Sequence, residues 1–230
     1  MPDQQQFFAV VPAPVQAGGM SDERSWDARY AESERVWSGE PNVVLVREVD
    51  GLTPGTALDL GCGEGADAVW LATQGWTVTA ADISGVAIGK AREHAEAAGV
   101  KVDFQRHDLA RTFPEGSFDL VSAQFLYSYG DFPREHVLRL AAAAVTPGGV
   151  LLIEGHQDHG PYAHDGDGHP PVRFASPDEV IEELQLEPGG WAVLTNAVHD
   201  RIQTGPDGEP AHRTDSTIKL RRRTVNSGGD

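Results

Sequence analysis

The feature that most constrains the fold is a regular alternation of short apolar runs with helical segments between residues 56 and 153. The runs are rich in Val, Ile, Leu, Phe and Ala, which favour strands, and helical patterns separate most of them. Strands that alternate with helices form a parallel sheet, because each crossover returns the chain to the edge where the previous strand began. The expected strands cover residues 56–60, 76–81, 102–105, 118–124 and 150–153.

The end of the chain is predicted to be an antiparallel hairpin. Extended segments at residues 191–203 and 211–222 flank the turn signal Gly205-Pro206-Asp207-Gly208. Before them, Ser176-Pro177-Asp178-Glu179 combines an N-cap, a proline at the first helical position and a capping-box glutamate, so a helix to residue 186 is expected. The sequence therefore predicts an α/β fold with a sheet of seven strands, mostly parallel with a C-terminal antiparallel hairpin, and helices on both faces.

The N-terminal helix is predicted from aromatic spacing. Trp26, Tyr30 and Val36 or Trp37 are spaced to share one side of a helix that begins near residue 21 and that Gly39 ends. The other expected helices cover residues 42–49, 66–73, 84–98 and 133–145. Pro147-Gly148-Gly149 is expected to turn the chain into the fifth strand. Residues 155–173 are expected to form a loop rich in Gly, His, Asp and Pro.

The length of 230 residues suits one α/β domain with a full core. Residues 1–20 carry Gln-rich and Pro/Ala/Gly-rich stretches without periodicity, which indicates a disordered leader. We therefore expect a single domain over residues 21–223 and a flexible tail at 224–230. A chain that begins at Met20 should keep its stability.

Composition argues against several classes of partner. The formal net charge of −17 would repel a phosphate backbone unless the basic residues shared one face. No run of about 18 apolar residues exists to cross a bilayer, and the N-terminus lacks the basic start of a secretory signal. The lone Cys62 excludes an internal disulfide. We expect a cytoplasmic protein, monomer or homodimer, that binds neither nucleic acid nor membrane.

A glycine-rich turn, Asp59-Leu60-Gly61-Cys62-Gly63-Glu64-Gly65, separates the first expected strand from the following helix. Open parallel sheets bind ligands at this position, and glycines let the backbone approach the ligand closely. With Ala66 the turn also satisfies the looser dinucleotide pattern G-x-G-x-x-A, which leaves a nicotinamide-dependent oxidoreductase open. Against that alternative, Asp59 and Glu64 add negative charge, which suits an ammonium and disfavours a pyrophosphate.

Two further acids follow the second and third expected strands. Asp82 lies 23 positions after Asp59, where a carboxylate can accept hydrogen bonds from both ribose hydroxyls. Asp108 falls on the same edge and could accept from an adenine amino group. Together these acids predict a site for an adenosine-bearing cofactor.

These segments resemble the motifs of class I S-adenosylmethionine-dependent methyltransferases. The glycine turn is similar to their motif I, Asp82 to their ribose-binding acid, and His107-Asp108-Leu109 to their adenine-binding segment. Phe118-Asp119-Leu120-Val121 and Thr146-Pro147-Gly148-Gly149 resemble their fourth-strand motif and the turn before strand five, so the resemblance covers about residues 21–220. More narrowly, Trp37-Ser38-Gly39-Glu40-Pro41-Asn42 resembles small bacterial enzymes near the thiopurine and tellurite-resistance methyltransferases, whose N-terminal helix covers the cofactor.

The resemblance implies a Rossmann-like fold, S-adenosylmethionine as methyl donor and a role for each matching residue. Backbone around Gly61 and Gly63 would approach the methionine portion, and Asp59 would face its ammonium group. Asp108 and the Leu109 amide would hold the adenine. The remaining cofactor-binding residues implied are Asp82 with its neighbour Ile83 at the ribose, Gln124 under the methionine end, and Trp37 in the covering segment.

The acceptor side carries fewer signals. His156, which follows the fifth expected strand, is the best candidate for a general base because the pKa of imidazole suits neutral pH. Tyr127 and Tyr129, after the fourth expected strand, could each orient an acceptor or simply pack. Imidazole and carboxylate groups in residues 155–173 could bind a divalent metal, but we expect a polar lid and no metal. The groups concerned are His156, His159, His164, His169, Asp158, Asp165 and Asp167.

The function expected is methyl transfer to an O, N or S nucleophile of a small molecule. The alternatives are a nicotinamide-dependent oxidoreductase and a non-catalytic nucleoside-binding module that regulates a partner. We also expect residues 155–173 and the helix with Trp26, Tyr30 and Trp37 to form a lid over the acceptor pocket.

Overall fold

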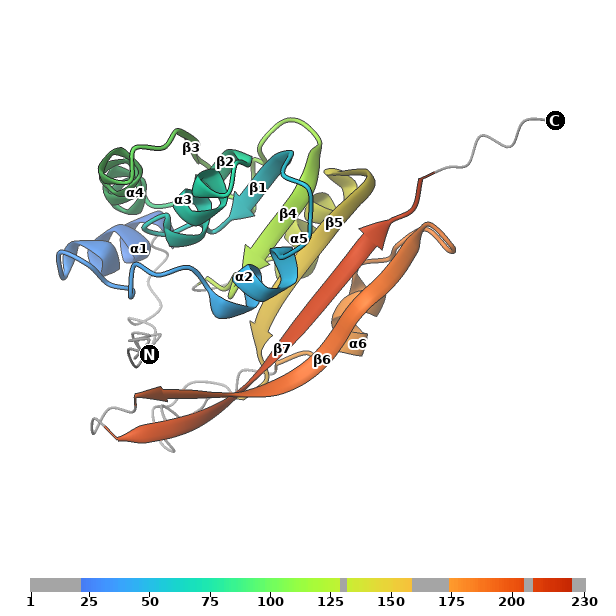
Figure 1. The fold of residues 1–230 in the computed structure, drawn as a ribbon. Helices are drawn as coiled ribbons and strands as arrows, with labels where there is room; N and C mark the ends of the chain where they lie inside the picture. Colours follow the sequence, from blue (N-terminus) through green and yellow to red (C-terminus); the bar gives the residue numbers. More distant parts are fainter. Residues whose placement is uncertain (1–21, 129–131, 159–173, 205–208, 225–230) are drawn as a thin grey trace.

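A single mixed sheet organises the molecule (Figure 1). The computed structural model describes residues 22–128, 132–158, 174–204 and 209–224. In these ranges seven strands lie in the order β3-β2-β1-β4-β5-β7-β6, with β1 to β5 parallel and β7 antiparallel to both of its neighbours. This confirms the predicted sheet and hairpin. The strands are β1 (Thr56–Leu60), β2 (Thr77–Asp82), β3 (Val102–Arg106), β4 (Phe118–Gln124), β5 (Val145–His156), β6 (Trp191–Thr204) and β7 (Pro210–Arg222).

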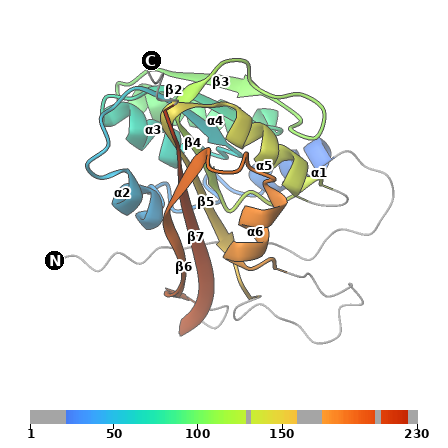
Figure 2. The ribbon, with the colours of Figure 1, turned by 90° about the vertical axis from the view of Figure 1, so that its right-hand side faces the viewer.

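Helices cover both faces of the sheet. On one face lie α2 (Val43–Val49), α3 (Ala66–Thr73) and α4 (Gly85–Ala97), and on the other α5 (Arg134–Ala143) and α6 (Pro177–Glu183). Figure 2 shows α2 and α3 on one side of the strands and α5 and α6 on the opposite side. The remaining helix, α1 (Asp22–Ala31), packs against α4.

Each face has its own hydrophobic core, because side chains alternate along a strand with a period of two residues. In β5, Val150 and Leu152 pack with α2, α3 and α4, whereas Leu151 and Ile153 pack with α5 and α6. All four side chains are buried. This two-sided burial explains why the middle of β5 reads as a continuous apolar run.

The predicted N-terminal helix is too long. α1 ends at Ala31, and residues 32–42 form an irregular segment. Tertiary contacts explain the difference, since the Glu64 carboxylate accepts hydrogen bonds from the backbone N–H groups of Val36 and Trp37. The Lys90 ammonium binds the Ser33 carbonyl oxygen of the same segment and the Tyr30 carbonyl oxygen near the end of α1. These partners satisfy the backbone without a helix.

Other boundaries also differ from prediction. β5 is longer than expected at both ends, and Pro147-Gly148-Gly149 lies inside it, next to a register shift, rather than in a turn before it. α5 ends at Ala143 because Val145 already pairs with Phe118 in the sheet. α6 has the predicted capping box at Ser176 but ends at Glu183, not at residue 186. The predicted loop from residue 155 therefore begins only after His156.

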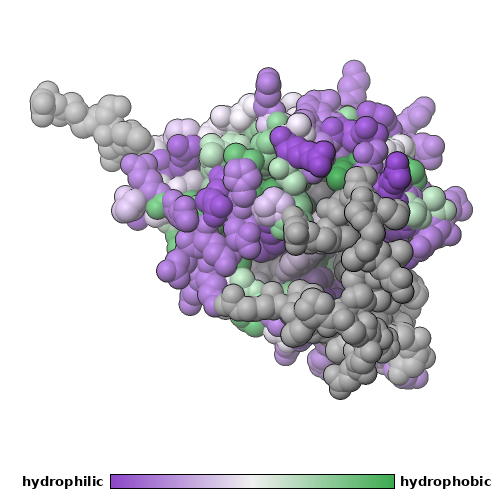
Figure 3. All heavy atoms as spheres, turned by 180° about the vertical axis from the view of Figure 1, so that it is seen from behind, coloured by the Kyte–Doolittle hydropathy of each residue, from purple (hydrophilic) through white to green (hydrophobic). Residues whose placement is uncertain are grey.

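The described surface seen from behind is mostly hydrophilic, with small hydrophobic patches between the polar side chains (Figure 3). Among the residues that the structure describes, no helix is long and apolar enough to cross a membrane. The expected leader at residues 1–20 lies outside the described residues, as does the tail except for Thr224.

Candidate active site

A cavity of about 230 Å³ opens at the carboxyl edge of the sheet. β1, β2, β4 and β5 all end at this cavity, since the residues at or just after their last positions line it. α1 and the irregular segment after it close another side. The cavity is thus where an open α/β sheet places its ligand. All nine predicted cofactor-binding residues line it, namely Trp37, Asp59, Gly61, Gly63, Asp82, Ile83, Asp108, Leu109 and Gln124.

The glycine turn is held against β2 by its own backbone. The N–H groups of Gly61 and Cys62 donate to the Ala81 carbonyl at 2.8 and 3.0 Å. Gly61 and Gly63 have φ angles of 72° and 52°, in the left-handed region that glycine adopts without strain. A Cβ atom on Gly63 would lie 2.8 Å from the Tyr30 hydroxyl, so the turn leaves no room for a side chain there.

Asp82 ties the end of β2 to the glycine turn. Its Oδ2 accepts from the Gly63 N–H at 2.8 Å, and its Oδ1 accepts from the Ser84 N–H at 2.9 Å. Burial raises the pKa of Asp82, and these amide hydrogen bonds oppose the rise. Each carboxylate oxygen has a second lone pair, so the group can still accept from two ligand hydroxyls.

Two buried oxygen atoms at the cavity have no hydrogen-bond donor among the residues that the structure describes. They are Asp59 Oδ2 and Gln124 Oε1. Burial, followed by the charges of Asp67 and Asp82, raises the pKa of Asp59. A buried acceptor without a partner costs about 1–3 kcal/mol, and a ligand that donates hydrogen bonds removes this cost. The pair therefore fits an ammonium group and offers nothing to a pyrophosphate.

The far end of the cofactor region lies after β3. Asp108 is partly buried and accepts from the Ala110 N–H at 3.1 Å, and its Oδ2 lies 3.3 Å from Nε of Arg111. Leu109 is buried beside it, and Ile83 is half-buried at the end of β2. This end combines a partly buried acid with apolar walls, a suitable surface for a purine.

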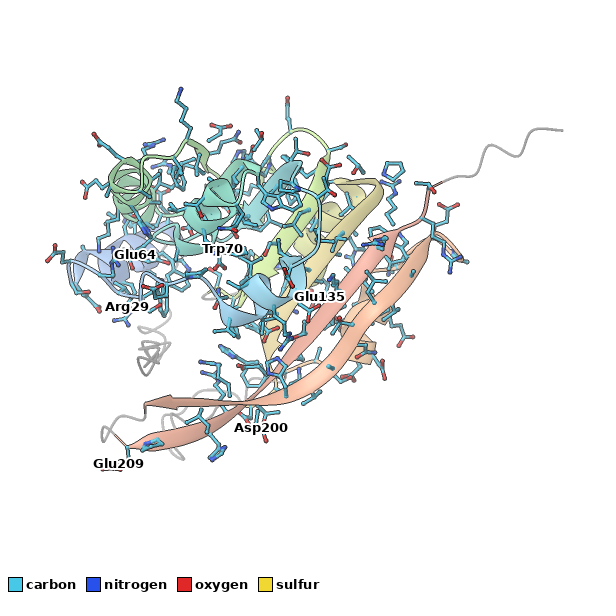
Figure 4. The ribbon with its side chains drawn as sticks, in the orientation of Figure 1. Arg29, Glu64, Trp70, Glu135, Asp200 and Glu209 are labelled. Atoms are coloured by element: carbon cyan, nitrogen blue, oxygen red, sulfur yellow. The ribbon has the colours of Figure 1, made fainter. Side chains whose placement is uncertain are left out.

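The segment with Trp26, Tyr30 and Trp37 lies over the cavity. The Trp37 indole N–H donates to the Tyr30 hydroxyl at 3.1 Å, and the Trp26 indole N–H donates to Ser128 Oγ, after β4, at 2.9 Å. Glu64 anchors this cover from below, between α1 and α4 (Figure 4), because it binds the backbone of residues 36 and 37 and also Lys90. The three aromatic residues thus lie together at the cavity, but they do not share one helix as predicted, because α1 ends before Trp37.

His156 occupies the other end of the cavity. Its Nδ1 lies 2.8 Å from Oδ1 of Asp215, which faces it from β7, and its ring stacks on those of Phe125 and Tyr127. Desolvation lowers the pKa of His156, while Asp215 raises it. No hydrogen bond engages the second ring nitrogen, Nε2, within the described part of the chain. This arrangement fixes the imidazole and leaves one nitrogen for a ligand.

Tyr127 is tied to β5. Its hydroxyl oxygen accepts from the His156 backbone N–H at 2.9 Å, and Arg134 stacks on its ring. Burial raises the pKa of this phenol. The Tyr127 O–H therefore stays protonated and can donate to a ligand, but it cannot act as a base near neutral pH. Tyr129 lies outside the described residues.

Sequence reasoning missed three charged residues of the hairpin, Arg201, Arg213 and Asp215. Asp215 is fully buried and receives a hydrogen bond from Arg201 Nε. All three lie 45 or more positions after His156, and only the pairing of β5, β7 and β6 brings them together. The one available signal was charge at alternate positions of strands that should pack on a core.

Metal ligands do not gather in the described ranges. No three His, Cys, Asp or Glu side chains there could hold a metal ion. His159, His164, His169, Asp165 and Asp167 lie outside the described residues, and the Asp158 carboxylate accepts from the Thr214 N–H at 2.9 Å.

The glycine turn and the strands around it match known proteins. A family model described as a methyltransferase domain covers residues 57–149, from the first strand to the turn within β5. The ubiquinone biosynthesis O-methyltransferase of Pseudomonas paraeruginosa is 32% identical over 134 residues, 56% of each chain. Over residues 57–149 these matches support the resemblance to class I S-adenosylmethionine-dependent methyltransferases. Two proteins of the same fold have been solved with such a nucleoside, DhpI with SAH and a magnesium protoporphyrin IX methyltransferase with SAM. The unpartnered oxygens of Asp59 and Gln124 fit the ammonium group of this cofactor.

Solved structures extend the similarity beyond the family model. A protein studied for the conversion of a disulfide bond into a thioacetal group during echinomycin biosynthesis is 27% identical, with a TM-score of 0.68 over 90% of this chain and 94% of that one. TehB from Haemophilus influenzae, at 18% identity, shares the fold with a TM-score of 0.63 over 88% of this chain and 67% of its own.

The curated relatives are longer than the matched region. The chain spans between 30% and 61% of the length of the first of them. Among them are methyltransferases named for ubiquinone biosynthesis, for a rifamycin, for ribosomal RNA and for tRNA. Proteins with a similar methyltransferase domain are therefore named for acceptors of very different size.

Proposed function

We propose that the protein transfers the methyl group of S-adenosylmethionine to an O, N or S nucleophile of a small molecule. One observation carries the proposal: a single cavity contains both a set of buried acids at the glycine turn and a His156–Asp215 pair at the opposite end. The first end suits a cationic nucleoside, and the second suits removal of a proton from an acceptor. A nicotinamide-dependent oxidoreductase would need a pyrophosphate site where Asp59 lies.

At the cofactor end we assign binding roles to the predicted residues. Asp59 and Gln124 would accept hydrogen bonds from the methionine ammonium, Asp82 from the ribose and Asp108 from the adenine. When bound, S-adenosylmethionine supplies a methyl group already activated by a sulfonium. The protein therefore has to align the acceptor and exclude water more than it has to activate the donor.

At the acceptor end we assign His156 as general base. The acceptor X–H would donate its proton to Nε2 as the new bond to carbon forms, and Asp215 would stabilise the imidazolium through Nδ1. Tyr127 would donate a hydrogen bond to the acceptor from its buried hydroxyl. The lowered pKa of His156 keeps its imidazole neutral, and so ready to accept a proton, at neutral pH.

The cover over the cavity supports a small acceptor. The Trp26–Ser128 hydrogen bond joins α1 to the opposite rim, and the Trp37–Tyr30 hydrogen bond holds the cover together. A base within RNA would have to enter past this cover, and the net charge of −17 opposes a polyanion. We keep the expectation of a cytoplasmic monomer or homodimer, in which the Trp37 segment acts as part of a lid.

Two experiments test the proposal. Calorimetric titration with S-adenosylmethionine, S-adenosylhomocysteine and NAD should give binding of the first two only, and NAD binding alone would favour the oxidoreductase. A screen for S-adenosylhomocysteine release against phenols, thiols, amines, carboxylates and bulk tRNA should find turnover with a small molecule. Cofactor binding without turnover on any acceptor would favour the regulatory module, and turnover on tRNA alone would reject a small acceptor.

A further inference from the structure

We propose that the methyl acceptor is a carboxylate-bearing, planar small molecule whose carboxylate binds the guanidinium of Arg213. The inference rests on the proposed function, because it concerns the acceptor end of the same cavity. It goes further by naming the chemical class of the acceptor and the residue that selects it.

The Arg213 side chain is buried and lines the cavity, yet most of its donors are unused. It is 9% exposed. Within the described part of the chain, one N–H group donates a hydrogen bond, from Nη2 to the Asp158 carbonyl at 3.3 Å. Nε is buried without a hydrogen-bond partner, 4.0 Å from Asp215 Oδ1. A guanidinium presents five donors in a planar fork that matches a carboxylate, so a bound carboxylate would satisfy Arg213.

Asp215 does not serve Arg213 as a full partner, because its oxygens are already engaged. Oδ1 binds His156 Nδ1 at 2.8 Å, and Oδ2 accepts from Arg201 Nε. Burial lowers the pKa of the Arg213 guanidinium, and the charges of Asp215 and Asp158 only partly offset this. Arg213 thus lies beside a buried carboxylate whose two oxygens are already engaged by other groups.

Among the described residues, the acids that line the cavity belong to its cofactor end, and Arg213 makes no hydrogen bond to any of them. An anionic acceptor would balance the charge of the Arg213 guanidinium, whereas a neutral one would not. Because charges in a partly desolvated site interact more strongly than in water, this difference favours an acid.

The position of Arg213 places the acceptor against the base. His156 pairs with Asp215 across β5 and β7, and Arg213 lies two residues before Asp215. With a period of two, Arg213 and Asp215 project from the same face of β7 and flank the imidazole. A carboxylate on Arg213 would therefore hold the rest of the acceptor within reach of His156.

The walls of this end favour a planar acceptor. Phe125 and Tyr127 line the cavity and stack on the His156 ring, with ring centroids 4.6 and 5.5 Å from it, and Phe132 also lines the cavity. An aromatic lining of this kind suits an aromatic acceptor better than a polar one. A small aromatic acid satisfies both the walls and the guanidinium.

Binding of simple probes to the protein saturated with S-adenosylhomocysteine tests the inference without turnover. Benzoate and phenylacetate should bind, and benzamide and phenylacetamide should bind about tenfold or more weakly, as expected for loss of a charged hydrogen-bond partner. Arg213→Gln should remove this preference for the acid, and Arg213→Lys should keep part of it. Arg221→Gln, on an exposed residue of the same strand, should leave it unchanged.

The outcomes separate this inference from the proposed function. Three results would overturn the inference. They are equal binding of acids and amides, no binding of the acids, and a preference for the acids that persists in Arg213→Gln. Retained S-adenosylhomocysteine affinity in the same variant would show that the cofactor end is intact, so the failure would concern only the acceptor class. If the unaltered protein failed to bind S-adenosylhomocysteine at all, that result would instead reject the proposed function.

Discussion

The two ends of the cavity are built in opposite ways. The cofactor end uses acids and glycines that lie at or just after the ends of strands within residues 59–124, and its buried charges are negative. The acceptor end uses His156, Asp215, Arg201 and Arg213, which three neighbouring strands bring together and which carry mixed charge. The first end follows from local chain order, whereas the second exists only once the hairpin has paired with β5.

This difference indicates which part of the molecule binds the methyl donor and which part binds the acceptor. The family model covers residues 57–149, which contain the acids and glycines of the cofactor end and stop before His156. Relatives that share this part have names as different as a ubiquinone biosynthesis O-methyltransferase and a tRNA methyltransferase. We infer that the cofactor end defines the donor and that the β5, β6 and β7 end defines the acceptor.

Replacing Gly63 with Val should have the largest effect and should be confined to the cofactor end. A side chain there meets the Tyr30 hydroxyl and forces an unfavourable φ, so measurable S-adenosylhomocysteine binding should be lost. Calorimetry gives the affinity and circular dichroism checks the fold. Gly89→Val, at an exposed helical site with nothing near the new atom, is the matched control. A folded Gly63→Val protein with normal affinity would place the cofactor elsewhere.

Replacing His156 with Gln should affect the acceptor end alone. We expect kcat to fall by about 10²- to 10⁴-fold, the usual contribution of a general base, with S-adenosylhomocysteine affinity unchanged. In the unaltered protein the neutral imidazole is the active form, and burial lowers its pKa, so activity should persist below the usual pKa of histidine before it declines. Asp215→Asn should move that decline to still lower pH, since Asp215 raises the pKa. A pH profile unchanged by both substitutions would remove His156 from catalysis.

Asp82→Ala should weaken S-adenosylhomocysteine binding by about 1.5–3 kcal/mol, through loss of a charged hydrogen-bond acceptor. Because Asp82 also binds the Gly63 and Ser84 amides, thermal unfolding must be measured beside calorimetry. Asp103→Ala, on the exposed side of β3, serves as control. An unaltered dissociation constant in a folded variant would contradict the ribose assignment.

Glu154 provides a test of stability at the acceptor end. Burial raises its pKa to about 8, and the Thr217 hydroxyl binds its Oε2 at 2.7 Å. The folded state therefore holds a proton that the unfolded chain releases near pH 4.5, so this residue should reduce stability as pH rises from about 4.5 to 8. Relative to Glu154→Gln, the decline should approach about 1.4 kcal/mol for each pH unit.

Urea unfolding of both proteins between pH 5 and pH 8 measures this slope. Glu93→Gln, at an exposed position of α4, should follow the unaltered protein. Parallel stability curves for Glu154→Gln and the unaltered protein would show that Glu154 titrates normally.

Trp37→Ala should have the smallest effect, because Trp37 only covers the cavity. S-adenosylhomocysteine binding should weaken by about 1 kcal/mol as the contact with Tyr30 and one hydrogen bond are lost, and turnover should also fall. Trp37→Phe keeps an aromatic ring without the indole N–H, so its affinity for S-adenosylhomocysteine should lie between those of Trp37→Ala and the unaltered protein. Full activity in both variants would argue against a lid role for this segment.

Local signals in the sequence were enough to predict the sheet, the helix starts and the cofactor end of the cavity. The alternation of apolar runs predicted the parallel sheet, and Ser84 and Ser176 predicted helix starts, because strand burial and N-caps depend on neighbouring residues. Asp59, Asp82 and Asp108 could be placed on one edge, since every parallel strand ends there. The cofactor end is thus a consequence of chain order.

Tertiary structure decided what these local signals could not reach. Glu64 and Lys90 replaced the expected helix after Ala31 with an irregular cover, because distant side chains satisfied its backbone. Likewise, His156 met Asp215 and Arg213 only through strand pairing across more than fifty residues. Register and side-chain pairing between distant strands depend on the packing of the whole sheet, so the acceptor end and its charge balance emerged only in the folded molecule.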